Sequence, residues 1–544
     1  MTMKRLPIGI DDFEKLRQGG YYYVDKTLMI KDFLEMKDEV ALIARPRRFG
    51  KTLNMTMLRD FFDMTKNSLD LFHGLAIMET EYGKQINSRP VIYFTFKDCK
   101  GDTAEDVFLL VKQKIYQEFL RYEKILRGKL DRTSYEGMDF YDMIDALRNP
   151  KTPIPLWTNS IQLLTQIVKE IFGVPPILLI DEYDQPIMSS YEKNFHEQMG
   201  TFFSNLYGSA MKGNPALGQA LLTGVQRVAK ESIFSQFNNA RVYTVLNPQY
   251  ASYFGLTEPE VEALLRTYGL SLTEAVKKEY DGYSFGGVEV YNPWSLLNYA
   301  DTKVLDYYWI NTSSNAFIRK ILQRADQRFW ENFDHLVLGE EVVVGLTLET
   351  SYIERDSNYS LWGLLVNSGY LTVRQRVDVN TAVVKIPNEE VMSEFQVLIS
   401  EIAGIEALDL RQMFQALLKK DMERFLKIYR GIVISCTRYM DAKENAYHML
   451  FLGMCITLKG LYRVTSNLES GYGRSDIILE SKKAGYPHVI IEFKQGKDLE
   501  RLKKEALQQI IEQKYYADLH GEVLCVGLAH DKKKCEMEYR VIEN

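Results

Sequence analysis

A short apolar run that leads directly into a Gly-Lys-Thr turn constrains the fold of this chain most strongly. The run is Val40–Ala44 (VALIA), a composition typical of a strand buried on both faces. Gly50, Lys51 and Thr52 follow it, and Leu53–Phe62 has helical periodicity. A strand, a glycine-containing loop and a helix in this order predict a phosphate-binding P-loop.

Further apolar runs predict that this strand belongs to a parallel sheet. Strands are expected at Val91–Phe96, Ile177–Asp181 and Gln219–Thr223. Residues 104–172 have a mostly helical pattern, interrupted by three prolines between 150 and 155. Strands that alternate with helices indicate an α/β domain with a doubly wound parallel sheet, which we place at residues 1–250.

The residues of the Gly-Lys-Thr turn suit binding of a nucleotide triphosphate. The helix that opens at Gly50 offers unpaired N–H groups and a positive dipole end to phosphate. Lys51 would reach the β- and γ-phosphates, and the Thr52 hydroxyl would coordinate Mg²⁺. Arg48 is a further predicted nucleotide contact. The usual loop begins with a glycine where this chain has Arg45, so the match to the general P-loop is partial.

Two acids at the end of the Ile177–Asp181 run complete the predicted ATP site. Asp181 suits the Mg²⁺ shell, and Glu182 suits a base that polarises the attacking water. Thr223 and Arg227 follow the next strand and are candidates for sensing the γ-phosphate, although a surface salt bridge explains Arg227 equally simply. The competing interpretation is a structural sheet whose strand-end acids face solvent.

Residues 251–435 are predicted to form a mostly helical middle region. One patch differs, because a helix, two strands and a second helix follow one another as in a winged-helix unit. The predicted elements are Leu361–Ser368, Tyr370–Val377, Ala382–Ile386 and Glu389–Ile402. A lid of the ATPase and a nucleic-acid-reading unit both remain possible interpretations. Leu408–Val433 is a charged amphipathic helical stretch that is expected to connect the two functional halves.

Residues 436–544 predict a compact unit with the order α-β-β-β-α-β. Its elements are Ala442–Lys459, Tyr462–Thr465, Asp476–Glu480, His488–Lys494, Asp498–Tyr516 and Glu522–Leu528. Asp476 opens one apolar strand and Glu492 closes the next, so a hairpin would bring both carboxylates to one edge. Glu492 and Lys494 are two residues apart and share a strand face.

This pattern suits hydrolysis of phosphodiesters. Carboxylates can hold a divalent ion that orients water, and Lys494 could contact that water or stabilise the transition state. Asp476 and Glu492 are the predicted metal ligands, Glu444 on the preceding helix is a further candidate, and Gln509 on the following helix is a candidate helper. A Glu–Lys salt pair on a solvated edge, with Glu444 and Gln509 as surface polar residues, is the alternative.

The composition sets limits on partners and location. The formal net charge is −6, so nucleic acid would have to bind local basic patches. The five cysteines contain no C-x-x-C pair, the N-terminus has no apolar signal segment, and no apolar run is long enough to span a bilayer. We therefore expect a cytoplasmic protein with no membrane association.

These residues together resemble a bacterial and archaeal family that joins an AAA-ATPase-like domain to a PD-(D/E)XK nuclease domain. The matching segments are Pro7–Phe13, Tyr22–Thr27, Arg45–Thr52, Leu179–Ile187, Leu222–Asn239, Tyr280–Trp294, Tyr308–Ser313, Gly473–Leu479, Val489–Lys494 and Ala506–Tyr516. The resemblance implies that Arg45 and Pro46 are the family's own version of the loop. It also implies a restriction-endonuclease-like C-terminal fold in which Asp476, Glu492 and Lys494 form the metal-dependent core, with Gln509 as a helper.

The expected function is therefore ATP binding, with hydrolysis, coupled to Mg²⁺-dependent cleavage of DNA or RNA. The alternative is a signalling or scaffold ATPase whose C-terminal domain binds nucleic acid or protein without cutting, since PD-(D/E)XK folds also occur in such proteins. AAA-like ATPases often take an arginine from a neighbouring subunit, so a homo-oligomer is a further expectation. The resemblance does not supply the substrate.

Overall fold

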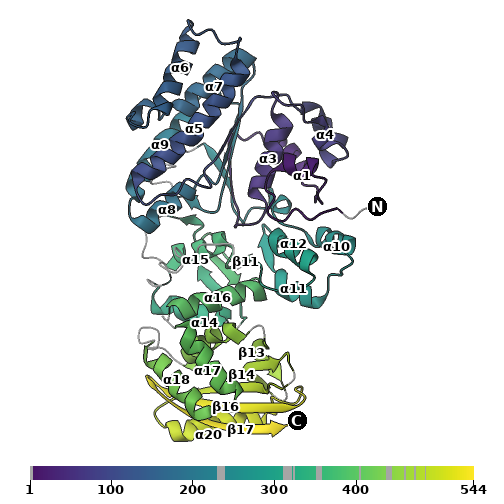
Figure 1. Cartoon of the computed structure of the whole chain (residues 1–544), viewed down its shortest axis with the longest axis vertical. Coiled ribbons are helices and arrows are strands. Elements are labelled where there is room, and N and C mark those ends of the chain that lie inside the picture. The colour runs from purple at the N-terminus through teal and green to yellow at the C-terminus, as the bar shows by residue number, and fades with distance from the viewer. Residues whose placement is uncertain are drawn as a thin grey trace. The chain divides into compact units, whose positions relative to one another are not determined.

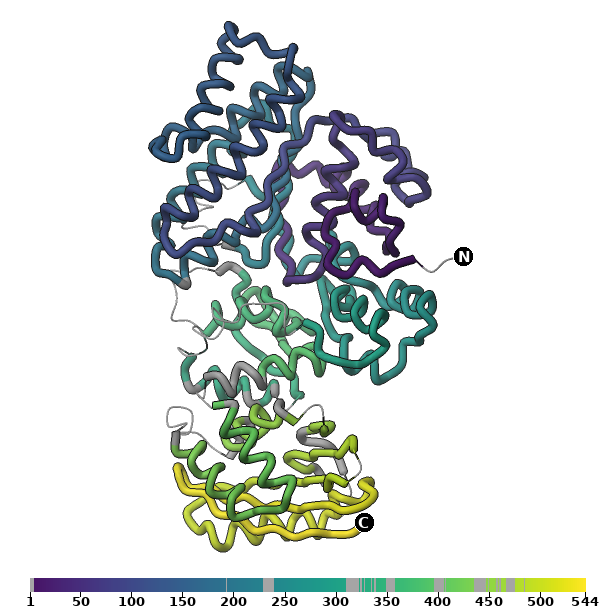
Figure 2. Tube along the Cα trace, in the orientation of Figure 1, coloured from purple at the N-terminus to yellow at the C-terminus, as the bar shows by residue number. Residues whose placement is uncertain are grey.

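The computed structural model describes most of the chain (Figures 1 and 2). The chain forms two compact units. The described residues are 4–228, 239–309, 322, 325–337, 339–350, 358–402, 406–435, 444–458, 461–470, 473–483 and 485–544. The first unit comprises Met1–Trp309 and Val343–Asn388, and the second comprises Ile310–Val342 and Glu389–Asn544. The domain boundaries that the sequence analysis placed at residues 250 and 435 remain predictions.

A five-stranded parallel sheet organises the first unit, as the sequence predicts. Its order is β2-β3-β4-β1-β6, and every neighbouring pair is parallel. The strands are β1 (Val40–Ala44), β2 (Val91–Thr95), β3 (Ile177–Asp181), β4 (Gln219–Gly224) and β6 (Ala240–Tyr243). All residues of β1 and β3 are buried, which explains their unbroken apolar sequences. The sequence analysis missed β6, a four-residue strand with an exposed arginine.

Helices follow the strands in the first unit, and those within residues 53–62 and 104–172 lie where the sequence predicts them. The helices include α3 (Lys51–Phe62), α5 (Ala104–Leu126), α6 (Tyr135–Arg148), α7 (Ser160–Phe172), α8 (Gln185–Lys193) and α9 (His196–Met211). The sequence analysis did not predict α8 and α9. Figure 1 shows α5, α6 and α7 side by side. A capping box between Thr103 and Asp106 starts α5, and Gly173 at a φ of 72° ends α7.

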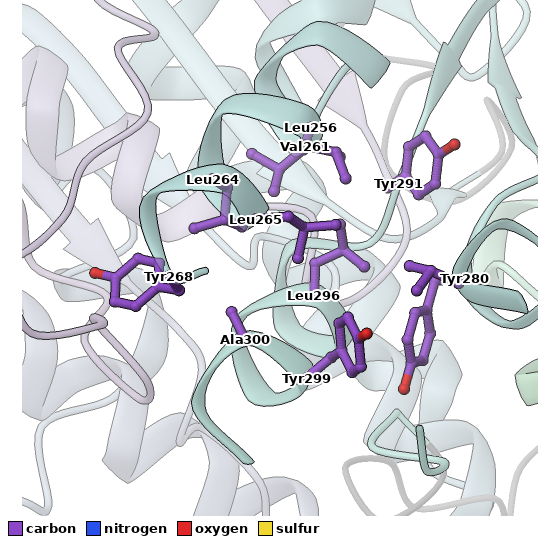
Figure 3. Close-up of a cluster of buried hydrophobic side chains, with 11 residues drawn as sticks. Leu256, Val261, Leu264, Leu265, Tyr268, Tyr280, Tyr291, Leu296, Tyr299 and Ala300 are labelled. Atoms are coloured by element: carbon purple, nitrogen blue, oxygen red, sulfur yellow. The ribbon is translucent and has the colours of Figure 1, made fainter. Parts of the chain in front are cut away.

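Residues 250–309 form a small helical layer with its own core. Its helices are α10 (Glu258–Thr267), α11 (Glu274–Tyr280) and α12 (Pro293–Thr302), and the hairpin β7 (Tyr283–Phe285) and β8 (Val288–Val290) lies between α11 and α12. Leucine and tyrosine side chains dominate this core (Figure 3). The sequence analysis predicted helices here but missed the hairpin, because three-residue strands carry too little periodicity.

The predicted helix, strand, strand, helix order beyond residue 350 is confirmed. The elements are α15 (Asn358–Ser368), β11 (Thr372–Arg376), β12 (Thr381–Lys385) and α16 (Glu389–Ile402). A strand missed by the sequence analysis, β9 (Val342–Gly345), joins β11 and β12 in a three-stranded sheet. The first three elements belong to the first compact unit, and α16 belongs to the second.

A mixed five-stranded sheet organises the second unit. The strands lie in chain order as β13 (Tyr462–Ser470), β14 (Gly473–Ser481), β15 (His488–Gln495), β16 (Glu522–Asp531) and β17 (Lys534–Glu543). Only the β15–β16 pair is parallel, and α20 (Leu499–Glu512) connects these two strands. With α19 (Glu444–Met454) before β13, the predicted α-β-β-β-α-β order is confirmed. The sequence analysis missed β17, an edge strand whose charged residues hide its alternation.

The predicted amphipathic helical stretch from Leu408 to Val433 is helical and consists of two helices. They are α17 (Ala407–Leu418) and α18 (Met422–Ser435), and Lys420 between them has a φ of 59°, which interrupts the helix. The remaining elements are α1 (Phe13–Gln18), α2 (Leu28–Met36), α4 (Leu69–Phe72), β5 (Arg227–Val228), α14 (Gln327–Val337) and β10 (Glu349–Thr350).

Gly527 in β16 lets α20 approach the sheet closely. A Cβ atom at this position would lie 2.6 Å from both the Leu507 nitrogen and the Lys503 oxygen, which are backbone atoms of α20. We expect Gly527→Ala to lower the local stability of α20 and β16 by about 1–3 kcal/mol, because the helix must shift. Hydrogen–deuterium exchange of these peptides in the full-length protein measures the change.

Gly431→Ala is the matched control in the same unit. Gly431 lies inside α18, and a Cβ atom there would meet nothing within 4 Å. Replacing a helix-interior glycine by alanine should leave α20 and β16 unchanged and slow exchange in α18. Equal exchange of β16 in wild type and Gly527→Ala would contradict the close packing.

Candidate functional site

The predicted phosphate loop closes around Lys51. Gly50 has a φ of 85°, a conformation that favours glycine, and it caps the start of α3. The Lys51 side chain is buried, and its Nζ atom donates to the backbone oxygens of Arg45 at 3.2 Å and Pro46 at 3.1 Å. The ammonium group therefore sits inside the turn that the sequence assigned to phosphate.

Arg45 explains why this loop departs from the usual glycine. Its guanidinium is fully buried and donates to the backbone oxygens of Ala44, Tyr243 and Gln249. It also lies over the rings of two phenylalanines, with its central carbon 5.3 Å from the Phe285 centroid. Arg45 thus ties the end of β1 to the segment after β6, a structural role that the sequence alone did not reveal.

Asp181 lies between two hydroxyl donors at the carboxyl edge of the sheet. Thr52 donates to one carboxylate oxygen at 2.7 Å, and Thr223 of β4 donates to the other at 2.6 Å. Burial is the main cause that raises the pKa of Asp181 to about 6, and the neighbouring Glu182 adds to it. The structure therefore brings together Thr52, Asp181 and Thr223, as their positions after parallel strands predicted.

Glu182 faces the loop lysine. Its Oε1 atom lies 3.6 Å from Lys51 Nζ, and its side chain is 17% exposed. Its φ of 53° is unusual for a residue other than glycine and is a strained conformation of a kind that clusters at functional sites. Glu182 is thus placed beside the residues that the sequence assigned to the phosphates.

Asp184 is a buried acid of this site that the sequence analysis did not identify. One carboxylate oxygen accepts the backbone N–H groups of Val225 at 2.9 Å and Gln226 at 2.7 Å. Burial, and then the charge of Glu182, raise the pKa of Asp184 to about 7. Asp184 therefore ties the start of α8 to the loop after β4. The sequence shows an acid three residues after Asp181. This spacing does not show that the acid binds the loop after β4.

The two arginines predicted to contact nucleotide lie on different elements. Arg48 is exposed, with its guanidinium carbon 4.4 Å from the centroid of the Trp294 ring. Arg227 begins β5 and pairs with Glu349 of β10. Nucleotide contact by either arginine stays a prediction.

The second predicted site lies where β14 and β15 begin to separate. Ile477 pairs with Ile491 in the antiparallel ladder, so Asp476 and Glu492 are the next residues along the two strands. Their side chains continue the pairing: Phe493 N donates to Asp476 Oδ2 at 2.8 Å, and Asp476 N donates to Glu492 Oε2 at 3.3 Å. The two predicted carboxylates are therefore neighbours.

Lys494 and Gln509 converge on the same carboxylate. Lys494 Nζ lies 3.5 Å from Glu492 Oε1, and Gln509 Nε2 of α20 donates to that oxygen at 2.5 Å. Gln509 Nε2 also donates to the Tyr515 hydroxyl at 3.1 Å. The structure thus brings together all four C-terminal residues that the sequence singled out as the core and its helper.

Burial dominates the electrostatics of this pair. Glu492 is 2% exposed, and burial followed by repulsion from Asp476 raises its pKa to about 8. Burial likewise raises the pKa of Asp476, against the opposing effects of the Phe493 N–H and Lys494. A buried carboxylate pair with raised pKa values is a common feature of functional sites, because a bound cation relieves the repulsion.

The neighbouring helix α19 contributes a histidine that the sequence analysis missed. His448 is buried, its Nε2 atom lies 3.1 Å from the Asp476 backbone oxygen, and burial lowers its pKa to about 4. A neutral His448 can therefore donate to that oxygen and hold the Asp476 backbone in place. Glu444, the predicted extra carboxylate, begins the same helix, but its side chain lies outside the described part of the structure.

The donor sets suit Mg²⁺, which keeps several water ligands, rather than a metal ion that is held by protein ligands alone. Across the described residues, no group of three or more His, Cys, Asp or Glu side chains could hold a metal ion. Mg²⁺ keeps several waters and commonly binds one or two carboxylates, which Asp476 and Glu492 can supply. At the first site, Thr52 and Asp181 would complete a shell that includes nucleotide phosphate.

Comparisons with known families agree with the two predicted domains. Residues 7–234 match the family model described as a predicted AAA-ATPase, and residues 442–540 match that of the PD-(D/E)XK nuclease superfamily. The chain therefore carries an AAA-ATPase-like domain followed by a PD-(D/E)XK nuclease superfamily domain, which confirms the resemblance.

One curated protein gives a longer match. An uncharacterized protein in the vnfD 5' region of Azotobacter chroococcum mcd 1 is 26% identical over 389 residues. The match covers 69% of this chain and 65% of that relative's length. In the residues that the structure describes, no helix has both the length and the apolar character needed to cross a membrane.

The raised pKa of Glu492 predicts a pH-dependent stability. A carboxyl group whose folded pKa lies above its unfolded value stabilises the fold fully at low pH, and this contribution is lost as pH rises toward about 8. The thermal stability of Glu492→Gln should therefore improve relative to wild type between roughly pH 5 and pH 9. Thermal unfolding of the full-length proteins in a metal chelator measures the difference.

Glu512→Gln provides the control, since Glu512 is an exposed carboxylate on α20. Its stability relative to wild type should stay constant over the same pH range. A constant difference for Glu492→Gln as well would contradict the electrostatic description of the carboxylate pair.

Proposed function

We propose that this protein binds and hydrolyses ATP and that its C-terminal domain cleaves phosphodiester bonds of DNA or RNA with Mg²⁺. The convergence of Asp476, Lys494 and Gln509 on Glu492 carries this proposal. A carboxylate that is 2% exposed within an apolar strand destabilises the fold unless its partners or a cation compensate. A structural role alone does not require such a group in that place.

In the nuclease site, Asp476 and Glu492 would hold the metal ion. When bound, Mg²⁺ supplies charge stabilisation and lowers the pKa of a coordinated water. Gln509 orients the Glu492 carboxylate through its hydrogen bond to Oε1. Lys494, 3.5 Å from the same oxygen, is placed to donate to a phosphate oxygen as negative charge develops there.

In the ATPase site, the N–H groups that open α3 and the Lys51 ammonium would bind the phosphates. Thr52 and Asp181 would hold the Mg²⁺ that accompanies the nucleotide. Glu182, 3.6 Å from Lys51 Nζ, would accept a hydrogen bond from the attacking water and orient it toward the γ-phosphate. Location in the cytoplasm and assembly into a homo-oligomer remain part of this proposal.

A second candidate function is nucleotide-controlled binding of nucleic acid or protein without cleavage. The observation that favours it is the engagement of both Glu492 oxygens inside the protein. Oε1 faces Gln509 and Lys494, and Oε2 accepts the Asp476 N–H. Metal binding must displace part of this arrangement, whereas a purely structural carboxylate would keep it.

A cleavage assay tests the nuclease proposal. Full-length protein is incubated with single- and double-stranded DNA and RNA, with Mg²⁺ or Mn²⁺, with and without ATP. We expect cleavage by wild type and a loss of about 100-fold or more in both variants, because Glu492→Ala removes a metal ligand and Lys494→Ala removes a positive charge beside the reacting phosphate. Lys427→Ala, which removes an exposed lysine of α18, should cleave normally.

Equal cleavage by wild type and both active-site variants would contradict the assignment of this site. Failure of wild type to cut any of these substrates would favour the second candidate function. Persistence of ATP binding in Glu492→Ala and Lys494→Ala shows that the N-terminal domain is intact.

A separate experiment tests the ATPase site. Lys51→Ala should weaken ATP binding by about tenfold or more, because it removes the ammonium from the phosphate loop. Glu182→Gln should keep ATP binding and lose most hydrolysis. Calorimetric titration and phosphate release measure the two effects, with Lys124→Ala on the exposed face of α5 as control. Unchanged ATP binding in Lys51→Ala would contradict the assignment of this loop as the nucleotide site.

A further inference from the structure

A cavity of about 400 Å³ lies at the turn that connects β14 to β15 in the second unit. Lys482, Lys483 and Tyr486 of this turn form one side of the lining. His520 and Gly521, which precede β16, form the other side. None of the residues assigned to the two sites above lines this cavity, so it is a separate feature of the C-terminal domain.

Lysine side chains give this cavity its charge. Lys482 and Lys483 are both exposed, and no ion pair of Lys483 is found in the part of the chain that the structure describes. Glu522 is the acid among the described lining residues, and it is already paired, because Lys420 Nζ lies 2.6 Å from Glu522 Oε2. The lining therefore carries an excess of positive charge, which suits a phosphate group.

His488 joins the two walls of the cavity. The Ser481 N–H donates to His488 Nδ1 at 3.1 Å, so the ring proton of the neutral imidazole lies on Nε2. This Nε2 atom lies 3.2 Å from the backbone oxygen of His520 and can donate to it. Gly521 and Asn544 exchange two backbone hydrogen bonds of 2.9 and 3.0 Å behind the second wall. The spacing of the walls is therefore fixed before any ligand binds.

Tyr486 gives the turn an exposed aromatic ring. Its side chain is 40% exposed, and its ring meets that of Tyr462 edge-on, with centroids 6.5 Å apart. Tyr462 is buried, and its hydroxyl donates to the Pro487 backbone oxygen at 2.8 Å, so it supports the turn from beneath. An aromatic ring beside cations is the combination that binds single-stranded nucleic acid, because rings stack on bases while cations contact phosphates.

The cavity lies on the same strand as the carboxylate site. His488 begins β15, and Glu492 follows four residues later on the same face. At about 3.3 Å per residue the two positions are about 13 Å apart, which is about four nucleotides at the 3.4 Å rise of one stacked strand. A nucleic-acid strand held at Glu492 therefore has a further phosphate within reach of the turn.

We infer that this cavity binds a backbone phosphate of single-stranded nucleic acid and that Tyr486 stacks on a neighbouring base, an inference that rests on the proposed nuclease function. Lys482 and Lys483 would contact the backbone, which carries no sequence information. The selection made here is therefore for unpaired bases rather than for a sequence. A duplex offers Tyr486 no free base face, because its bases stack on one another. The inference thus names unpaired DNA or RNA as the substrate class.

A salt titration of binding tests the phosphate contact. Fluorescence anisotropy measures the affinity of the full-length protein for single-stranded DNA and RNA of roughly 15 nucleotides, in a metal chelator that prevents cleavage. Lys482→Ala/Lys483→Ala should reduce the slope of log K against log salt by about 0.7 for each phosphate contact that is lost, and thus by about 0.7–1.4. Lys427→Ala, at an exposed lysine of α18 outside the cavity, should keep the wild-type slope.

Substitution of the exposed tyrosine tests the stacking contact. Tyr486→Ala should weaken binding of the single strand by about fivefold or more at an unchanged salt slope, because stacking on a base is not ionic. Binding of a duplex of the same sequence should stay at the wild-type level. Tyr486→Phe keeps the ring and should bind the single strand as wild type does. Tyr539→Ala, at an exposed tyrosine of β17 outside the cavity, is the matched control.

Cleavage by wild type in Mg²⁺ separates this subsite from the nuclease proposal. An unchanged salt slope in the double lysine variant overturns the phosphate contact, even where wild type cleaves. Equal loss of single strand and duplex binding in Tyr486→Ala overturns the preference for unpaired bases. The expected change in slope without cleavage by wild type supports the subsite and contradicts the nuclease function. Absence of both binding and cleavage in wild type overturns the two together.

Discussion

Both sites of this protein depend on carboxylates that are buried on apolar strands and held there by hydrogen-bond donors. Desolvation favours the neutral form of such a group, so each needs donors or a cation to remain charged. Asp181 receives two threonine hydroxyls, one from the phosphate loop and one from β4. Glu492 receives the Gln509 amide and the Asp476 N–H. The raised pKa values of about 6 and 8 show that these donors compensate for burial only in part. The charged form of each carboxylate would therefore be stabilised by a further positive charge, which is why we propose a divalent cation at each site.

The features that depend on neighbouring residues in the chain could be predicted from the sequence. Val40–Ala44 and Ile177–Asp181 form strands buried on both faces, and their unbroken apolar runs predicted this. Parallel strands present their carboxyl ends at one edge, so the meeting of Thr52 with Asp181 followed from the same reasoning. In the second unit, the alternation of Glu492 and Lys494 and the apolar strands around them predicted the carboxylate pair.

Features that depend on contacts between distant segments could not be predicted in this way. Arg45 replaces a loop glycine because it binds backbone oxygens near residues 243 and 249, about 200 positions away in the chain. Asp184 holds the backbone of Val225 and Gln226, a contact that no spacing in the sequence encodes. Strand β17 was missed for a different reason, because an edge strand exposed to solvent tolerates charge on both faces.

The most direct test of this account is a calorimetric titration of Mn²⁺ into the full-length protein near pH 7, repeated in buffers with different ionisation enthalpies. Because the pKa of Glu492 is raised to about 8, cation binding must expel a proton from the Asp476–Glu492 pair. The account predicts a binding event with proton release in wild type that is absent from Glu492→Gln. Metal binding without proton release would contradict the raised pKa of Glu492, and the same binding in Glu492→Gln would contradict the assignment of this carboxylate pair as a metal site.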